Sequence, residues 1–211
     1  QRMSDVVWAQ KHHFSSYSVI PNGARPAFMA SIERNFLNEK GIQASCVLLC
    51  VSNYQPSKGQ RELVQWFCEM KLPDTALVLI GSAFNSFSDG LKRFAGKRLN
   101  QTVFLFERQT EAEIHAAYRS ASIFVSATLT EVQPLMLLDA MAAGVPFLCR
   151  DVGVVKELPG GVCFDSKPTF EVQLRRLVAD SLWWSQLGKE GVRAIQTTYN
   201  WNKVASLYHQ L

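Results

Sequence analysis

Short apolar runs alternate with longer stretches of helical period from about residue 44 onward. The short runs are apolar almost throughout, which is typical of strands in a sheet covered on both faces. Strands are predicted at Ser45–Ser52, Ala76–Gly81, Thr102–Phe106, Ile123–Ala127, Pro146–Arg150 and Val162–Asp165. Helices are predicted between them at Gln60–Lys71, Ser88–Leu99, Glu111–Ser120, Pro134–Ala143 and Val154–Leu158. Since helices that join parallel strands form right-handed crossovers, the pattern predicts an α/β fold with a doubly wound parallel sheet.

Several helix ends carry recognisable chemistry. Thr110 followed by Glu113 forms a capping box, in which each side chain satisfies a backbone donor of the other residue. Pro134 opens another predicted helix, and Gly144 closes it. The helices at Glu111–Ser120 and Pro134–Ala143 therefore have the clearest end signals of the predicted helices.

The two flanks differ from this alternating middle. Residues 1–38 show no strong period, and we interpret them as a connection rather than a core element. Residues 171–211 are mostly helical and carry Trp183, Trp184 and Trp201, which either dock onto another surface or pack on the parent sheet. The predicted division is a connection at 1–38, a Rossmann-like domain at 39–195 and a carboxyl-terminal helix at 196–211.

Composition narrows the class of protein. With 211 residues, 47% hydrophobic and 19% charged, the chain has enough apolar material for one large core, which excludes a disordered, collagen-like or disulfide-stapled protein. The net charge is +4, and the basic residues are scattered, the densest groups being pairs such as Lys92-Arg93 and Arg175-Arg176. This distribution predicts no nucleic-acid partner.

Cysteine usage and hydropathy bear on location. The five cysteines are odd in number, lie in apolar segments and form no CxxC motif, so we expect buried free thiols in a reducing compartment and no zinc site. No apolar run approaches the ~20 residues that span a bilayer. We therefore expect a cytoplasmic protein. Any membrane association is expected to be peripheral, at the inner face of the membrane.

Candidate chemistry follows the ends of strands, because ligands of open parallel sheets bind outside the carboxyl ends. Lys58 and Gly59 stand after the first strand at the start of a helix, where the helix dipole favours an anion. They form a candidate phosphate clamp, although a surface lysine on a flexible loop is an equal alternative. The P-loop is excluded, since its first glycine and its Ser/Thr are missing.

Two carboxylates accompany the helix that follows the fourth predicted strand. Asp139 lies on a helix that is otherwise apolar around its circumference, so it is expected to be buried and to face a ligand hydroxyl or a backbone amide. A structural carboxylate is the alternative. Glu131, in the loop before this helix, can approach a ligand, or it can support the start of the helix.

Glycines at two further strand ends give weaker signals. Gly153 permits close backbone approach in the loop before Glu157. Gly81 also ends a strand, but no GxGxxG follows it, which argues against a standard NAD site.

Taken in order, these motifs resemble the carboxyl-terminal domain of a GT-B glycosyltransferase of the retaining family 4. The matching run is Val19 to Gly23, Lys58-Gly59, Leu79 to Gly81, Glu131, Asp139 to Pro146, Val152-Gly153 and Glu157. Its most specific part is the pair of carboxylates with seven residues between them, followed by Ala-Met-Ala and Gly-x-Pro. The resemblance covers nearly the whole chain.

The resemblance implies a donor site for a UDP-, GDP- or ADP-sugar. Lys58 would hold the diphosphate with Gly59, Asp139 would bind the ribose hydroxyls, and Glu131 would lie near the transferred sugar, so Lys58 and Glu131 are the expected catalytic residues. Arg108, with Phe106 and Glu107, would border the base, and Gly153 would approach the donor. No metal or other cofactor is expected, because lysine and a helix dipole can stabilise the departing diphosphate.

Four departures from the family pattern stand in the donor motifs. Asn53 occupies a position where many members have arginine, and Asp139 replaces the usual glutamate. Pro134 replaces a glycine and offers no backbone N–H, and Val154 replaces a frequent second glycine. We therefore keep open a non-catalytic nucleotide-sugar-binding module, and another GT-B enzyme such as a nucleotide-sugar epimerase or a polysaccharide synthase.

The leading hypothesis is retaining hexosyl transfer from a nucleotide diphosphate sugar to an acceptor hydroxyl. A complete GT-B enzyme has two Rossmann-like domains, and 211 residues supply one. We expect the acceptor, whether glycan, lipid-linked sugar or small molecule, to be bound by an amino-terminal domain that this chain lacks, and the chain alone to be inactive.

Overall fold

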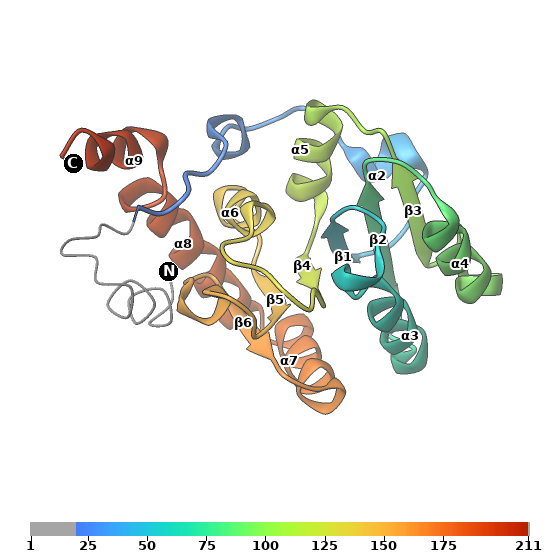
Figure 1. The fold of residues 1–211 in the computed structure, drawn as a ribbon. Coiled ribbons are helices and arrows are strands. Elements are labelled where there is room, and N and C mark those ends of the chain that lie inside the picture. Colours follow the sequence, from blue (N-terminus) through green and yellow to red (C-terminus); the bar gives the residue numbers. More distant parts are fainter. Residues whose placement is uncertain (1–19, 211) are drawn as a thin grey trace, which may run out of the picture.

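A single parallel sheet forms the centre of the molecule, in a computed structural model that describes residues 20–210 (Figure 1). The six strands have the order β3-β2-β1-β4-β5-β6, and every neighbouring pair is parallel. In chain order, the strands are β1 Cys46–Val51, β2 Thr75–Gly81, β3 Val103–Glu107, β4 Ile123–Ser126, β5 Phe147–Arg150 and β6 Gly161–Phe164. This order confirms the doubly wound, Rossmann-like sheet predicted from the sequence.

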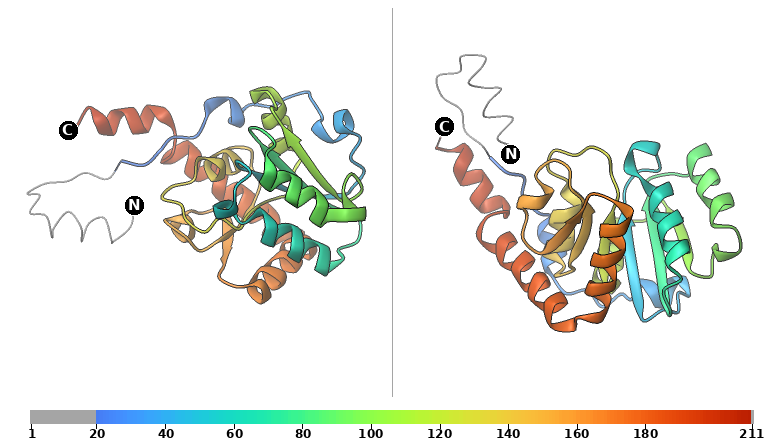
Figure 2. Two further views of the ribbon diagram at one scale, coloured as in Figure 1. Left: turned by 45° about the vertical axis from the view of Figure 1, so that its right-hand side comes forward. Right: turned by 90° about the horizontal axis from the view of Figure 1, so that it is seen from below.

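Helices cover both faces of this sheet. The α-helices are α2 Phe36–Lys40, α3 Gln60–Met70, α4 Ser86–Ala95, α5 Glu111–Ser120, α6 Leu135–Ala142, α7 Lys167–Ala179, α8 Ser181–Thr197 and α9 Trp201–Tyr208. Short 3-10 turns lie at η1 Pro26–Met29, η2 Pro56–Lys58, η3 Gly96–Arg98 and η4 Val155–Glu157. Figure 2 shows α9 extending away from the sheet.

Two apolar clusters lie between the sheet and its helices. One joins side chains of α5 and α6 to one face of the sheet, and the other joins α3, α4 and α7 to the opposite face. Alternate residues of β1 divide between them, with Val47 and Leu49 in the first cluster and Leu48 and Cys50 in the second. The strands are therefore buried on both sides, which explains why their sequences are apolar throughout.

The segment before β1 contributes to the core, contrary to the expectation that residues 1–38 only connect. Among its described residues, Phe28 and Phe36 are fully buried in the cluster beneath α5 and α6. The sequence showed no period here because η1 and α2 are too short to repeat one. Residues 1–19 lie outside the described residues.

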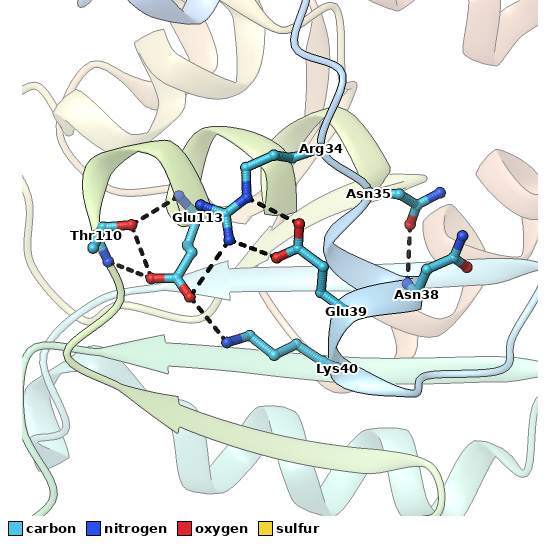
Figure 3. Close-up of polar contacts among 7 residues, drawn as sticks. All are labelled: Arg34, Asn35, Asn38, Glu39, Lys40, Thr110 and Glu113. Carbon is cyan, nitrogen blue, oxygen red and sulfur yellow. Dashed lines mark hydrogen bonds and ion pairs between the residues drawn. The ribbon is translucent and has the colours of Figure 1, made fainter.

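Ion pairs fasten the same segment to α5 (Figure 3). Lys40 Nζ lies 3.1 Å from Glu113 Oε1, and Arg34 Nη2 lies 3.8 Å from the same oxygen while pairing at 2.6 Å with Glu39 inside the segment. Glu113 also completes the predicted capping box with Thr110. The start of α5 and the turn of α2 are thus held as one unit.

The tryptophans of the carboxyl-terminal helices differ in how far they are buried. Trp184 donates from Nε1 to the carbonyl oxygen of Ser122 at 2.6 Å, and the ring of Trp183 lies 3.8 Å from the Arg176 guanidinium. Both therefore pack on the parent domain. Trp201 is 48% exposed.

Most predicted elements lie within two residues of the observed ones, with two differences in kind. The helix predicted at Val154–Leu158 is a single 3-10 turn, and the helix predicted at Ser88–Leu99 ends at Ala95, where the 3-10 turn η3 replaces it. The cysteines are free, but only Cys50 and Cys149 are buried, whereas Cys46, Cys68 and Cys163 are partly exposed because they lie near the ends or edges of their elements.

Candidate functional site

The chain reverses its winding direction between β1 and β4. The connection after β1 leads to α3 on one face of the sheet, and the connection after β4 leads to α6 on the other. The two connections therefore diverge at the carboxyl edge and leave a crevice, which is where doubly wound folds bind ligands.

Two cavities occupy this edge. The larger, of about 460 Å³, is lined by Gly23, Arg25, Val51, Ser52, Asn53, Lys58, Tyr118, Leu135, Met136, Asp139 and Trp201. The smaller, of about 370 Å³, is lined by Val51, Ser52, Asn53, Ile80, Gly81, Ser82, Arg108, Gln109 and Ile114. Because Val51 to Asn53 line both, the cavities adjoin across the end of β1. A third cavity of about 460 Å³, between α3 and α4, lies apart from this edge.

Arg25 pairs with Asp139 at the floor of the larger cavity. Its Nε lies 3.2 Å from Oδ1 and its Nη2 lies 2.6 Å from Oδ2, which is a bidentate contact. Asp139 is buried, as predicted from its apolar helix. The expectation that only a ligand hydroxyl or backbone amide faces it is wrong, because a guanidinium from the segment before β1 reaches it.

Burial and the guanidinium act on the Asp139 carboxyl in opposite directions. Desolvation raises the pKa of Asp139, and the hydrogen bonds and charge of Arg25 oppose that rise. The net pKa is raised from its ordinary value. Arg25 is therefore the group that offsets the cost of burying this carboxylate in the cavity.

Lys58 contacts the other carboxylate that the sequence singled out. Its ammonium donates to Glu131 Oε1, and both side chains are largely buried. The hydroxyl of Thr128 lies 3.4 Å from the same oxygen. Glu131 precedes α6 and is not in its first turn, so it pairs with lysine here instead of supporting the helix start.

Close backbone packing explains two of the predicted glycines. A Cβ atom at Gly59 would lie 2.1 Å from the carbonyl oxygen of Ala127, and one at Gly153 would lie 2.3 Å from that of Glu131. Both residues have positive φ, 65° and 61°. These glycines bring the loops after β1, β4 and β5 together, and so position Lys58 against Glu131.

The smaller cavity ends at Arg108. This residue has a φ of 52°, its side chain is 78% exposed, and its Nε lies 3.7 Å from Glu107 Oε2. Phe106 and Glu107 end β3 just before it. Asn53 is exposed at the junction of the two cavities.

The amino end of α6 opens into the larger cavity, which Leu135 and Met136 line. Pro134 stands at its N-cap, and within the described part of the chain no side chain caps this end. Its first backbone N–H groups and its positive dipole end face the crevice. Such a terminus attracts an anion.

The structure thus brings Asn53, Lys58 and Asp139 into one cavity, with Glu131 in contact with Lys58 and Arg108 in the adjoining cavity. Gly59 and Gly153 allow the loops that carry these side chains to pack closely together. Sequence reasoning assigned no site role to Arg25 or Trp201, nor to Gly23, although Gly23 ends the first part of the matching run. Gly23 faces the Trp201 ring, which would lie 2.8 Å from a Cβ there. The Pro21-Asn22-Gly23 turn was the signal available.

Two negative observations concern residues 20–210. No helix in this range has the length and apolarity that crossing a bilayer requires. Nor does any group of three or more His, Cys, Asp or Glu side chains lie close enough together to hold a metal ion.

The fold is that of one half of a GT-B glycosyltransferase. A sequence model described as glycosyl transferases group 1 matches residues 33–160, which is more than half of the chain. The chain therefore belongs to the group 1 glycosyltransferase family.

Individual relatives agree with this assignment. The alpha-monoglucosyldiacylglycerol synthase of Acholeplasma laidlawii is 27% identical over 152 residues, which are 65% of this chain and 37% of that enzyme. The structure of sucrose-phosphate synthase from Thermosynechococcus elongatus superposes with a TM-score of 0.79 at 22% identity, covering 98% of this chain and 55% of that one.

HepE from Anabaena, solved in complex with UDP-glucose, superposes with a TM-score of 0.75 at 15% identity, covering 92% of this chain and 57% of that one. The chain spans less than half the length of the curated relatives it matches. At these identities, the solved structures establish the shared fold.

Proposed function

We propose that this domain binds a nucleotide diphosphate sugar and supports retaining transfer of its hexosyl unit to an acceptor hydroxyl. The observation that carries the proposal is the pair of adjoining cavities at the switch point, one holding a buried carboxylate and two cations, the other bordered by Arg108. A buried carboxylate accepts from hydroxyls, and cations at helix ends hold phosphates. HepE, with UDP-glucose bound, has the same fold.

Each part of the donor has a place in this arrangement. The base occupies the smaller cavity beside Arg108, and the ribose hydroxyls donate to Asp139. The diphosphate lies between Lys58 and the amino end of α6, close to Gly59 and Asn53. The sugar then extends toward Glu131, which makes Lys58 and Glu131 the groups nearest the reaction.

Transfer requires the bond between the sugar's anomeric carbon and the diphosphate oxygen to break. The acceptor oxygen bonds to that carbon on the same face, and the acceptor proton passes to the departing diphosphate. Lys58 and the α6 dipole stabilise the charge that develops on that oxygen, without a metal ion. Positioning contributes more than a side-chain nucleophile does.

The acceptor would lie on a second domain, because the relatives are about twice as long as this chain. A glycan, a lipid-linked sugar or a small molecule would serve. We further propose a cytoplasmic setting, with any membrane contact peripheral.

A binding module without catalysis is the second candidate. Asn53 carries no charge at the junction of the cavities, and Pro134 supplies no N–H at the start of α6. Both features weaken contacts to a departing diphosphate. A full-length protein that binds donor but never releases nucleoside diphosphate in the presence of acceptors would favour this candidate.

The test of donor binding is calorimetric titration of the chain with UDP, GDP and ADP, repeated with Asp139→Ala. At least one nucleotide should bind the parent chain with a Kd below about 1 mM, and the variant should bind it at least about tenfold more weakly, as expected for lost bonds to a charged group. Asp89→Ala on α4 removes an exposed carboxylate that lines neither cavity and is the control. Equal binding by Asp139→Ala would show that the carboxylate plays no part.

A further inference from the structure

The two cationic side chains of the larger cavity are not equally available to a bound anion. A nucleoside diphosphate carries about two to three negative charges at pH 7, given a second phosphate pKa near 6. Among the described residues that line this cavity, the cationic ones are Arg25 and Lys58. The Lys58 ammonium is already in contact with the Glu131 carboxylate, so its charge is partly neutralised.

Arg25 is held rigidly where it meets the cavity. The Arg25 guanidinium carbon lies 4.0 Å from the ring centroid of Phe28, which is fully buried and stacks on His115 at 4.9 Å. Asp139 fixes its plane from one edge through Nε and Nη2. A guanidinium between a buried ring and a buried carboxylate has little freedom left to lose when it binds.

Arg25 still has N–H groups to donate. Of the five guanidinium N–H donors, two are used by the Asp139 oxygens, and Nη1 lies 3.6 Å from Glu111, which is a longer contact. Its side chain is 42% exposed and lines the cavity. The remaining donors therefore reach an anion there without breaking the pair with Asp139.

We propose that Arg25 is a donor-binding residue, whose guanidinium holds the diphosphate with its free N–H groups while its pair with Asp139 stays intact. It supplies the second positive charge of the site, from the segment before β1 and not from the loop after β1. The inference rests on the proposed function, because it assigns a residue to that same donor.

The test compares UDP with uridine, because uridine keeps the ribose and lacks the phosphates. Arg25→Gln should weaken UDP binding by about tenfold or more, the worth of hydrogen bonds to a charged group, and uridine binding by less than about threefold. Affinities come from calorimetry for UDP and from NMR titration for uridine; GDP and guanosine, or ADP and adenosine, replace them if they bind more tightly. Equal weakening of both ligands, or none, would overturn the assignment.

Two further variants sharpen the comparison. Arg34→Gln removes an arginine of the same segment that pairs with Glu39 outside the cavity, and it should leave both affinities unchanged. Asn53→Arg in the Arg25→Gln background returns a positive charge to the same cavity and should recover most of the lost UDP affinity. Failure of this recovery would count against a role in phosphate binding.

A direct measurement covers the case in which Arg25→Gln does not fold. The Arg25 Nη–H resonances, assigned by their loss in Arg25→Lys, should shift clearly more when UDP binds the parent chain than when uridine binds. A resonance that uridine moves as far as UDP does would overturn the proposal. If the parent chain binds none of the nucleotides, the proposed function itself fails; if it binds them in a way that Asp139→Ala weakens, only Arg25 is at issue.

Discussion

Arg25 and Asp139 lie 114 positions apart in the chain, yet their side chains meet with Nη2 2.6 Å from Oδ2. The partners are unequally placed, since the Asp139 side chain is 5% exposed and that of Arg25 is 42% exposed. A carboxylate left alone here would remain in apolar surroundings, whereas a guanidinium left alone would reach water. Removing Arg25 is therefore expected to cost more folding stability than removing Asp139.

This asymmetry predicts that Arg25→Gln destabilises the fold more than Asp139→Asn. Breaking a buried pair costs about 3–5 kcal/mol when the remaining charge is trapped, and about 1 kcal/mol is expected where it is hydrated. Urea unfolding at pH 7 measures both losses. Equal losses would show that the Asp139 carboxylate is not trapped.

The same pair predicts a pH dependence. Burial raises the pKa of Asp139 and Arg25 opposes the rise, so the pKa should rise further in Arg25→Gln. A raised folded-state pKa favours the folded state below the unfolded pKa, and this contribution is lost as pH rises through the folded value. The stability gap between parent and Arg25→Gln should therefore shrink as pH falls toward 4. A gap that is constant with pH would contradict this account.

Gly59→Ala should destabilise the protein by more than Gly41→Ala. Both glycines have φ near +65°, but a Cβ at Gly41 meets no atom within 4 Å, whereas one at Gly59 would lie 2.1 Å from the Ala127 carbonyl oxygen. Gly41→Ala thus measures backbone strain alone, about 1 kcal/mol, and serves as the control. Thermal unfolding of the two variants gives the comparison, and equal losses would show that the Ala127 approach is not tight.

Features that depend on neighbouring residues were predictable from the sequence, whereas a contact between distant segments was not. The strands and the α5 cap were predictable because burial on both faces and a local capping box are written in neighbouring residues. Lys58, Glu131 and Asp139 were predictable because each follows a strand end or lies on an apolar helix. The Arg25 contact was not, because a partner for a buried carboxylate can come from any part of the chain, and the short turns around Phe28 carry no period.

Glu131→Gln should change the preference of the site between free nucleotide and donor sugar. Removing this carboxylate frees the Lys58 ammonium from its partner, so UDP should bind about threefold or more tightly, as expected for one partly buried charge contact. A UDP-sugar should gain less than UDP, because Glu131 would also contact the sugar in the proposed site. Calorimetry with UDP and UDP-glucose measures this ratio. Weaker UDP binding would show that Glu131 does not compete for Lys58.

Glu113 should make stability depend on acid pH. Hydrogen bonds from Thr110 and Lys40 lower the pKa of Glu113 from 4.5 to about 2. A lowered folded-state pKa contributes stability above the unfolded value, and that contribution is lost as pH falls through the folded one. The free-energy difference of unfolding between the parent and Glu113→Gln should therefore be present at pH 7 and vanish near pH 2, while exposed Glu33→Gln shows no such change. A difference that persists at pH 2 would contradict the network in Figure 3.

A crystal structure of this chain with UDP tests the central claim most directly. The account predicts the ribose hydroxyls on Asp139, the diphosphate between Lys58 and Arg25 at the amino end of α6, and the base in the cavity beside Arg108. A nucleotide bound elsewhere, such as in the groove between α3 and α4, or a ribose turned away from Asp139, would contradict it.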